Sequence, residues 1–205
     1  EPGPDNPNTG GMGAFGPLPQ WDESLSLAIK SDIVDPCLRD LRLRGTPFVG
    51  CLYPGLMVTQ RGLRVLEFNA RFGDPEAQVE LRLLETDLYE VMKACVEKRL
   101  HEIPIKWRQG FVVCVVLASE QYPYGSSSPS RITGIADAEQ DQRVIVYRAG
   151  TKLDNGDDIA VRDRVLHVTA WGATLAEARQ CVYEAVSKIH FKGMQFRKDI
   201  AAGVA

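Results

Sequence analysis

The sequence lacks the marks of a membrane protein, a zinc-binding module or a nucleic-acid-binding protein. No apolar run approaches the roughly 20 residues that span a bilayer, and the net charge of −3 gives no basic footprint for nucleic acid. The five cysteines are scattered without a Cys-x-x-Cys pair, and the three histidines show no metal-ligand spacing. We therefore expect no membrane or nucleic-acid partner and a reduced, cytoplasmic location.

What is present is the composition of a globular protein. Hydrophobic residues make up 44% and charged residues 25% of the 205 residues, which suffices for one or two domains with a sizeable core. Residues 1–20 are rich in proline and glycine and are expected to form a loop. Because the chain opens on Glu1 inside this loop, we expect it to be a piece of a longer protein.

The most informative segment is residues 65–76, which read VLEFNARFGDPE. A strand directs alternate side chains to opposite faces, so Glu67, Asn69 and Arg71 are expected to share one face. Carboxylate and amide oxygens suit Mg²⁺, and the fork of an arginine suits phosphate. The segment is also compatible with an ordinary half-buried strand and a Gly-Asp-Pro turn. Asn is depleted in strands, and this favours a nucleotide-phosphate site.

A second candidate segment is rich in glycine and reads Asn8-Thr9-Gly10-Gly11-Met12-Gly13. Glycine permits positive φ and lets backbone N–H groups approach an anion closely. The segment is compatible with a flexible connector as well as with an anion-binding loop.

The first half of the chain predicts helices around one β-hairpin. Asp22 is the expected N-cap of a helix that is interrupted near Pro36. Thr86 is the expected N-cap of a later helix, whose apolar stripe, including Met92 and Val96, is expected to pack in a core. The predicted elements are helices over 22–44, 76–84 and 86–100 and strands over 48–59 and 63–70.

The second half predicts a compact α+β unit that begins near residue 105. Thr174 and Glu177 have the spacing of a capping box, which opens a helix that ends near Lys188. The predicted strands cover 111–118, 131–136, 143–148 and 164–171.

In order and spacing, several segments resemble the phosphoribosylamine–glycine ligase family of the ATP-grasp superfamily, and the resemblance covers essentially the whole chain. The matching segments are 6–14 (NPNTGGMGA), 50–57 (GCLYPGLM), 67–76 (EFNARFGDPE), 149–152 (AGTK), 168–170 (VTA) and 196–200 (FRKDI). The resemblance implies an α+β fold. Residues 1–105 would be the second half of an ATP-grasp domain, an antiparallel sheet with helices, and residues 106–205 a small α+β C-terminal domain.

The resemblance also implies a reaction, an ATP-dependent ligation of glycine to 5-phosphoribosylamine through glycyl phosphate in purine biosynthesis. The products are glycinamide ribonucleotide, ADP and phosphate. ATP is the implied co-substrate and Mg²⁺ the implied cofactor, with Mn²⁺ as an alternative. The implied partner is the missing N-terminal half of the same enzyme, which carries the lysine-bearing part of the ATP clamp, so the isolated chain is expected to be inactive.

Site roles carry over residue by residue. Glu67 and Asn69 would be metal ligands, Arg71 would steady the transferred phosphoryl group, and Asp74 would hold a substrate amine. The implied substrate-binding residues are Asn8, Thr9, Gly10, Gly11 and Gly13.

The sequence departs from the family pattern in places that leave the metal ligands intact. The departures are Asn6 for a glycine, Pro54 for a small residue, Arg148 for a histidine, and Arg162-Asp163 for Gly-Gly. The partner strand of the hairpin, residues 48–58, carries no carboxylate, which fits the glycine ligases better than the ATP-grasp carboxylases. Two alternatives stay open: another ATP-grasp carboxylate–amine ligase, and a non-catalytic fragment or assembly module.

Overall fold

A computed structural model describes residues 9, 11–125 and 127–204 of this chain. These residues form two compact units, each of which is discontinuous in sequence. Unit 1 takes the described residues of Glu1–Pro17, Asp74–Leu83 and Arg108–Ala205, and unit 2 takes Leu18–Gly73 and Leu84–Trp107. The predicted α+β class with antiparallel sheets is confirmed. The assignment of 1–105 and 106–205 to two domains stays a prediction.

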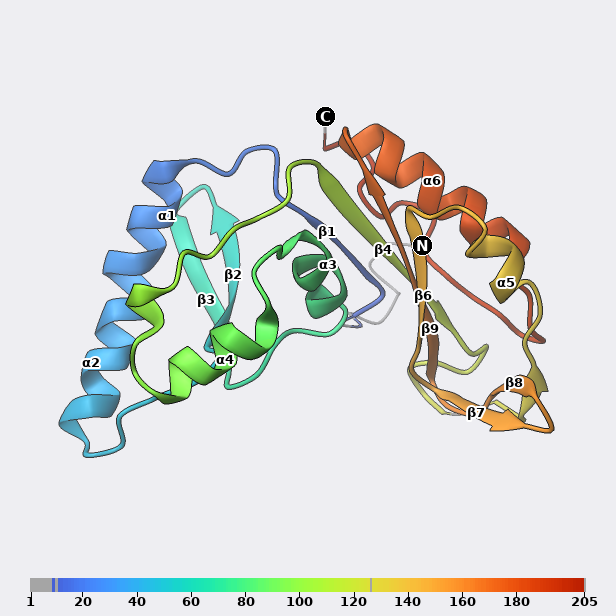
Figure 1. Cartoon of the computed structure of the whole chain (residues 1–205), viewed down its shortest axis with the longest axis horizontal. Helices are drawn as coiled ribbons and strands as arrows, with labels where there is room; N and C mark the ends of the chain where they lie inside the picture. The colour runs from blue at the N-terminus through green and yellow to red at the C-terminus, as the bar shows by residue number, and fades with distance from the viewer. Residues whose placement is uncertain (1–8, 10, 126, 205) are drawn as a thin grey trace. The chain divides into compact units, whose positions relative to one another are not determined.

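Unit 1 is built on a four-stranded antiparallel sheet, in the order β1-β4-β9-β6 (Figure 1). Its strands are β1 (Gly13–Gly16), β4 (Phe111–Ala118), β6 (Val144–Arg148) and β9 (Arg164–Gly172). Strand β4 is a continuous apolar run because both of its faces are buried. The glycine-rich segment thus ends in a strand, β1, where the sequence predicts only loop.

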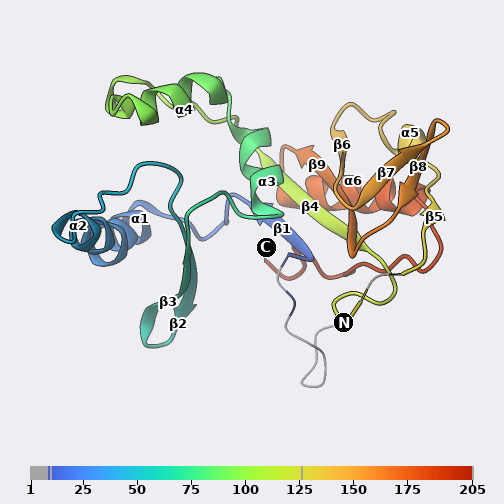
Figure 2. The same cartoon turned by 90° about the horizontal axis from the view of Figure 1, so that it is seen from below.

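Two helices cover the opposite faces of this sheet. Helix α6 (Leu175–Lys188) lies along β4 and β9 (Figure 2), and its predicted capping box is present: the Thr174 hydroxyl accepts from the Glu177 N–H at 3.2 Å. Helix α3 (Glu76–Leu83) packs Val79 and Leu83 on the other face, against Val112 and Cys114 of β4. A sheet covered on both sides supplies the hydrophobic core of unit 1.

A three-stranded sheet, in the order β5-β8-β7, completes unit 1. It contains β5 (Ser130–Arg131), β7 (Thr151–Asp154) and β8 (Asp157–Ala160). The predicted strand over 131–136 is wrong beyond β5, because the chain turns at Gly134 into helix α5 (Ile135–Ala138). Strands β7 and β8 were not predicted, although the Asn155-Gly156 turn between them, with positive φ at both residues, is a strong hairpin signal.

The helical part of unit 2 begins at the predicted cap, since the Asp22 carboxylate accepts from the Leu25 N–H at 2.7 Å. Helix α1 (Glu23–Ile29) runs into α2 (Asp35–Leu43) through a single π-helical segment, Lys30–Val34. The predicted interruption is therefore a change of helix type. Pro36 lies in the first turn of α2, where its missing N–H costs little.

A two-stranded antiparallel hairpin of β2 (Tyr53–Thr59) and β3 (Gly62–Asn69) follows, and its turn projects away from α4 (Leu88–Val96) (Figure 2). A short 3₁₀ helix (Leu100–Glu102) comes after α4. The cap of α4 is Asp87, which accepts from the Tyr89 N–H at 2.8 Å, so the prediction of Thr86 is wrong. The Thr86 hydroxyl donates instead to the Pro104 carbonyl.

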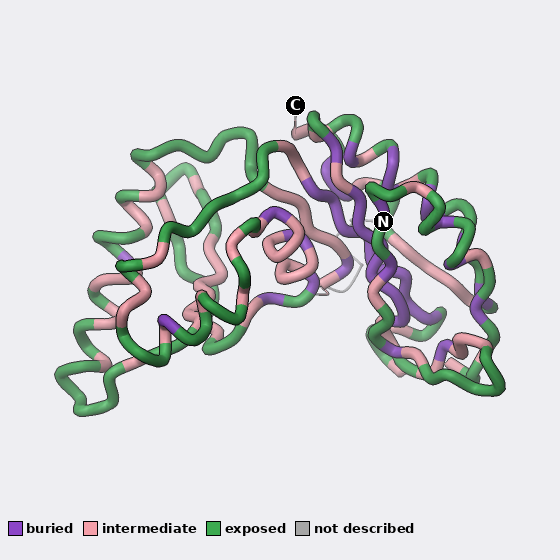
Figure 3. The backbone as a smooth tube through the Cα atoms, viewed as in Figure 1, coloured by how far each residue is buried: buried purple, intermediate pink, exposed green. Residues whose placement is uncertain are grey.

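Unit 2 buries little apolar surface (Figure 3). Among its described residues, the buried hydrophobic side chains are Ile33 and Ala94. Met92 is 49% exposed and Val96 is 74% exposed, so the prediction that the α4 stripe packs in a core is wrong for this chain. In the described part of the chain, no helix has the length and hydropathy needed to cross a membrane.

Candidate functional site

The hairpin of unit 2 brings two predicted metal ligands together. Near the end of β3, the amide Nδ2 of Asn69 donates to Oε1 of Glu67 at 2.9 Å. The two side chains therefore lie on the same face of the strand, as the alternation predicts. Glu67 is exposed and Asn69 is half-buried, so neither is sequestered in an apolar interior.

A β-bulge and a glycine set the position of Glu67. In the register of the hairpin, Gly55 pairs with Glu67 and Leu56 pairs with Val65, so Leu66 is the extra residue. Such bulges redirect side chains next to functional sites. A Cβ at position 55 would lie 3.2 Å from Cγ of Glu67. A glycine opposite Glu67 therefore leaves room for the carboxylate.

Arg71 lies outside this alternation, because β3 ends at Asn69. Its Nη1 donates to the Phe72 carbonyl at 2.8 Å, a local bond that shapes the turn after the strand. Its other guanidinium nitrogens make no hydrogen bond with a described residue and are available to an anion.

The donor set on the hairpin fits a magnesium ion that is shared with a phosphate substrate. Glu67 and Asn69 offer one carboxylate and one amide oxygen, both hard ligands. No cluster of three or more His, Cys, Asp or Glu side chains able to hold a metal occurs among the described residues. Magnesium is commonly bound by one or two protein oxygens, with waters and substrate phosphates completing its shell, and this pair suits that kind of site.

Asp74, the other predicted catalytic residue, belongs to unit 1, and its carboxylate accepts hydrogen bonds from two side chains. Its Oδ2 accepts from Nη2 of Arg164 at 2.5 Å, and its Oδ1 accepts from the amide of Gln78 at 2.9 Å. Nδ1 of His167 lies 3.4 Å from the same Oδ1. A substrate amine at Asp74 would share the carboxylate with Arg164, and the amine-binding role stays a prediction.

His167 is buried beneath α3 and is neutral. Burial lowers the pKa of its imidazole, against the opposing effect of the Asp74 carboxylate. The side-chain amide of Gln78 lies 2.6 Å from Nδ1 of the ring. The other ring nitrogen, Nε2, is buried and makes no hydrogen bond with a described residue.

The glycine-rich segment is described in part, since Asn8 and Gly10 lie outside the described residues. Gly11 has a φ of +77°, and its carbonyl accepts from Nη1 of Arg164 at 3.2 Å. Gly13 lies in β1, where an added Cβ would meet Ile200 at 2.6 Å. Close packing accounts for the glycine at position 13, while the roles of Thr9, Gly11 and Gly13 in substrate binding stay predictions.

Arg164 and His167 were not identified from the sequence. Both lie on β9, and Arg164 joins Gly11 to Asp74, positions that are far apart in the chain. A local signal was present for His167, which interrupts a largely apolar run, whereas Arg164 follows Arg162 and Asp163 at the start of β9. The partners of both residues are set by tertiary structure.

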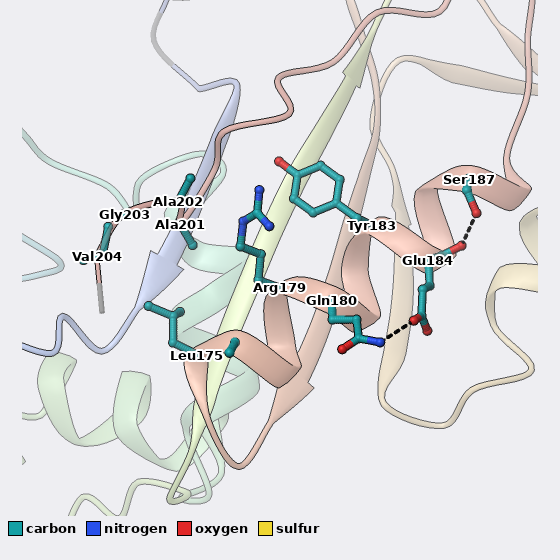
Figure 4. Close-up of a pocket in the computed structure, with 11 residues that line it drawn as sticks. Leu175, Arg179, Gln180, Tyr183, Glu184, Ser187, Ala201, Ala202, Gly203 and Val204 are labelled. Atoms are coloured by element: carbon teal, nitrogen blue, oxygen red, sulfur yellow. Dashed lines mark hydrogen bonds between the residues drawn. The ribbon is translucent and has the colours of Figure 1, made fainter.

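A groove of about 740 Å³ lies along α6 (Figure 4), and its lining includes none of the predicted site residues. Its polar side chains fasten the C-terminal segment: Arg179 donates to the carbonyls of Lys198 and Ile200, and the Tyr183 hydroxyl donates to that of Arg197. The polar side chains of the groove therefore have a structural role, since they attach the C-terminal segment to α6.

Comparisons with known proteins give matches over most of the chain. The family model "Phosphoribosylglycinamide synthetase, ATP-grasp (A) domain" matches residues 2–77, and the model of the C domain of that family matches residues 112–203. The phosphoribosylamine–glycine ligase of Streptomyces coelicolor is 44% identical over 206 residues, covering 99% of this chain and 50% of the relative. The trifunctional purine biosynthetic protein adenosine-3 of Gallus gallus is 45% identical, covering 97% of this chain and 20% of the relative.

A solved structure is also similar. The crystal structure of the phosphoribosylamine–glycine ligase of Thermotoga maritima superposes with a TM-score of 0.81 at 32% identity, covering 95% of this chain and 47% of that chain. The fold and these matches define an ATP-grasp protein. The chain belongs to the phosphoribosylglycinamide synthetase family, also called the phosphoribosylamine–glycine ligase family. It spans about half the length of the single-function relatives that it matches.

Proposed function

We propose that the enzyme containing this chain joins glycine to 5-phosphoribosylamine, using ATP, to give glycinamide ribonucleotide, ADP and phosphate. The carboxylate of glycine attacks the γ-phosphorus of ATP, which forms glycyl phosphate and releases ADP. The amine of phosphoribosylamine then attacks the acyl carbon, and phosphate leaves. The observation that carries this proposal is the Glu67–Asn69 pair on the hairpin, in a chain that matches this family along most of its length.

Glu67 and Asn69 are the residues that would hold Mg²⁺, or Mn²⁺ in its place, against the triphosphate. Bound there, the cation would neutralise charge on the phosphates of ATP. The hydrogen bond from Asn69 to Glu67 orients both oxygens before substrate arrives. Preorganised ligands lower the cost of assembling the site.

Arg71 supplies the positive charge for the transferred phosphoryl group in this proposal. Phosphoryl transfer depends on positioning and charge neutralisation more than on a protein nucleophile. A guanidinium fork with free nitrogens provides both, through two parallel bonds to phosphate oxygens. Asp74 and the glycine-rich segment 8–13 complete the assignment, the first at a substrate amine and the second over the acyl phosphate.

The remaining half of the enzyme is the proposed partner of unit 2. The helices and hairpin of unit 2 expose large apolar side chains, among them Leu43, Val58 and Leu66, which are 80%, 72% and 64% exposed. Patches of this kind mark interaction surfaces. We assign them to the part of the enzyme that this chain does not span and that carries the rest of the ATP clamp. The free thiols of all five cysteines suit a cytosolic enzyme.

The test uses the full-length enzyme and follows glycine-dependent ADP release together with product formation. Glu67→Ala and Asn69→Ala are each expected to lower activity by at least about 100-fold, because each removes a ligand needed to neutralise the triphosphate. Glu90→Ala, at an exposed position on α4 of the same unit, is the matched control and retains activity. A panel of amino acids identifies the acid that is used. Full activity of Glu67→Ala at saturating Mg²⁺ would contradict the metal assignment, and preference for an acid other than glycine would contradict the substrate assignment.

A further inference from the structure

We propose that Arg82 and Arg108 form a binding site for the phosphate group of a small molecule, on the face of the main sheet of unit 1 that α3 covers. Both arginines, and the residues that hold them in place, belong to unit 1. The site is independent of the ligase reaction proposed above, because neither arginine has a part in that reaction and binding is measured without turnover.

Arg82 reaches β9 from one side of α3. It lies one helical turn after Gln78, whose side-chain amide meets His167 on the same strand. Nη1 of Arg82 donates to the hydroxyl of Thr169 at 3.0 Å and to its carbonyl at 3.2 Å. Nε and Nη2 of Arg82 make no hydrogen bond with a described residue, so two nitrogens of the guanidinium are available to a ligand.

Arg108 is fixed beside Trp171 on the same strand. Its Cζ lies 3.9 Å from the centre of the Trp171 ring, and its backbone N–H donates to the Leu83 carbonyl at 2.6 Å. The indole is itself held, because its Nε1 donates to the Gln109 carbonyl at 3.1 Å. A planar guanidinium stacked on an aromatic face directs its N–H donors outward in its own plane. The side chain of Arg108 is exposed and makes no hydrogen bond with a described residue.

The alternation of β9 brings the two guanidinium groups together. Thr169 and Trp171 are two residues apart, so their side chains lie on one face of the sheet, about 7 Å apart along the strand. The register of β9 with β4 is unbroken over these residues, and the bulge of this pair lies earlier, between Arg164 and Leu166. The arginine bonded to Thr169 and the arginine stacked on Trp171 therefore occupy neighbouring positions on this face.

The charge of the arginine pair is not balanced by a carboxylate. Neither arginine forms an ion pair with a described residue, whereas Arg143 and Arg164 of the same unit each pair with an aspartate. Burial lowers the pKa of Arg82, Tyr147 opposes this effect, and the charge of Arg108 lowers the pKa further. A half-buried charge without a counter-ion is costly, and an anion bound between the two groups removes that cost.

Two guanidinium groups suit a phosphate better than a carboxylate. A carboxylate is fully engaged by the planar fork of one arginine. A phosphate monoester carries about two negative charges near neutral pH, and its three terminal oxygens can accept bonds from both groups at once. Clusters of arginines are a recurrent means of phosphate recognition in proteins. The pair of unbalanced charges and the free N–H donors therefore match a phosphate group.

The test follows the indole N–H signal of Trp171 in two-dimensional NMR spectra of the isotope-labelled 205-residue chain. Inorganic phosphate or ribose 5-phosphate is added at constant ionic strength, without Mg²⁺ or ATP, and Trp171→Phe assigns the signal. The wild type is expected to show a saturable shift with both probes. The probe that binds more tightly shows whether the site prefers free phosphate or an organic phosphate.

Three variants locate the binding. Arg82→Gln and Arg108→Gln are each expected to weaken phosphate binding by about 10-fold or more, because each removes charged hydrogen bonds to the ligand. Arg162→Gln, at an exposed arginine of the same unit, is the matched control and is expected to bind phosphate as the wild type does. Arg108 is exposed, so its variant keeps the test decisive even if Arg82→Gln fails to fold.

Thermal unfolding gives a second measurement that a purely structural role would not affect. A ligand that binds only the folded chain raises the Tm. Phosphate is therefore expected to raise the Tm of the wild type and of Arg162→Gln by more than that of either proposed-site variant. The general stabilisation by phosphate, through its exclusion from protein surfaces, is common to all the proteins and cancels in this comparison.

Several outcomes would overturn the proposal. Equal phosphate binding by the wild type, Arg82→Gln and Arg108→Gln would show that the pair is not the site. A shift of the Trp171 signal that does not saturate would show only a general effect of salt. Tighter binding of a short polyglutamate peptide than of either phosphate probe would show that the pair receives an acidic protein segment. Loss of binding in Arg71→Gln alone would place the phosphate on unit 2 instead.

Discussion

At the scale of single residues, Gly11 combines a backbone requirement with a lack of space. Its φ of +77° disfavours any residue with a Cβ, and the Arg164 guanidinium fills the place that a Cβ would take. Gly156, in the same unit, has a φ of +88° with open space around it. A comparison of Gly11 with Gly156 therefore separates the effect of the backbone conformation from the effect of the missing space.

We predict that Gly11→Ala destabilises the chain by more than Gly156→Ala. The control is expected to cost about 1 kcal/mol for its backbone conformation alone. Gly11→Ala carries the same cost and also displaces Arg164, for a total of about 2–4 kcal/mol. Urea unfolding of the two variants measures both values. Equal destabilisation would show that Arg164 moves aside freely.

His167 is the residue from which we expect a pH dependence of stability. Its folded-state pKa lies below the ordinary value near 6.5, because burial penalises the charged ring. The unfolded chain therefore binds more protons, and stability must rise with pH in this range. The contribution is present above about pH 6.5 and is lost as the pH falls through the folded-state pKa.

The measurement is urea unfolding of the wild-type chain and of His167→Gln between pH 5 and 8. The wild type is expected to lose stability below about pH 6.5, and the variant is expected to show a smaller loss over the same range. Identical slopes for the two proteins would mean that His167 is not the titrating group.

At the scale of elements, α6 begins where the local sequence predicts it to begin. Its Thr174–Glu177 capping box satisfies N–H groups that the first helical turn leaves unpaired, and its inner face buries Ala178, Val182 and Val186 against the main sheet. Local capping and tertiary packing therefore favour the same boundaries.

Thr174→Ala is expected to lower the free energy of unfolding by about 1 kcal/mol, because it removes the cap of α6. Thr174→Ser keeps the hydroxyl and is the matched control, with an expected change of less than about 0.5 kcal/mol. Thermal unfolding of both variants checks the prediction. A wild-type Tm for Thr174→Ala would show that packing alone determines where the helix begins.

At the scale of the whole molecule, the two units differ in how much of their apolar surface is buried. Unit 1 buries a continuous core between α6, α3 and its sheet. Unit 2 leaves apolar side chains of its hairpin and helices exposed. Because apolar exposure at this scale is costly in water, unit 2 is suited to being covered by further protein.

We predict that the 205-residue chain alone releases no ADP from ATP in the presence of glycine and Mg²⁺. It carries the proposed ligands Glu67 and Asn69, while we propose that the rest of the ATP clamp belongs to the part of the enzyme that it does not span. A coupled ADP assay with the chain at micromolar concentration measures this. Glycine-dependent ADP release above that of the Glu67→Ala variant would contradict the prediction.

Much of the fold followed from local patterns. The caps at Asp22 and Thr174 and the strands β3 and β4 were predicted close to their observed bounds, because each depends on interactions within a few residues. The strand predicted over 48–59 is shorter in the structure, where β2 begins at Tyr53. The predictions were wrong where the outcome depends on which of several residues forms an interaction, or on whether a core is available. Asp87 is the N-cap of α4 in place of Thr86. Met92 and Val96, in the apolar stripe of α4, are exposed because unit 2 buries few apolar side chains.

The sequence by itself determined that the side chains of Glu67 and Asn69 lie together, since the two-residue period of a strand places both on one face wherever the hairpin lies. It also determined the family, whose motifs are contiguous. Only the tertiary structure decided that Arg164 meets both Gly11 and Asp74, that His167 is buried and neutral, and that Gly13 packs in a sheet. These contacts join residues far apart in the chain, and a bulge of one residue in β9 changes which face a side chain reaches.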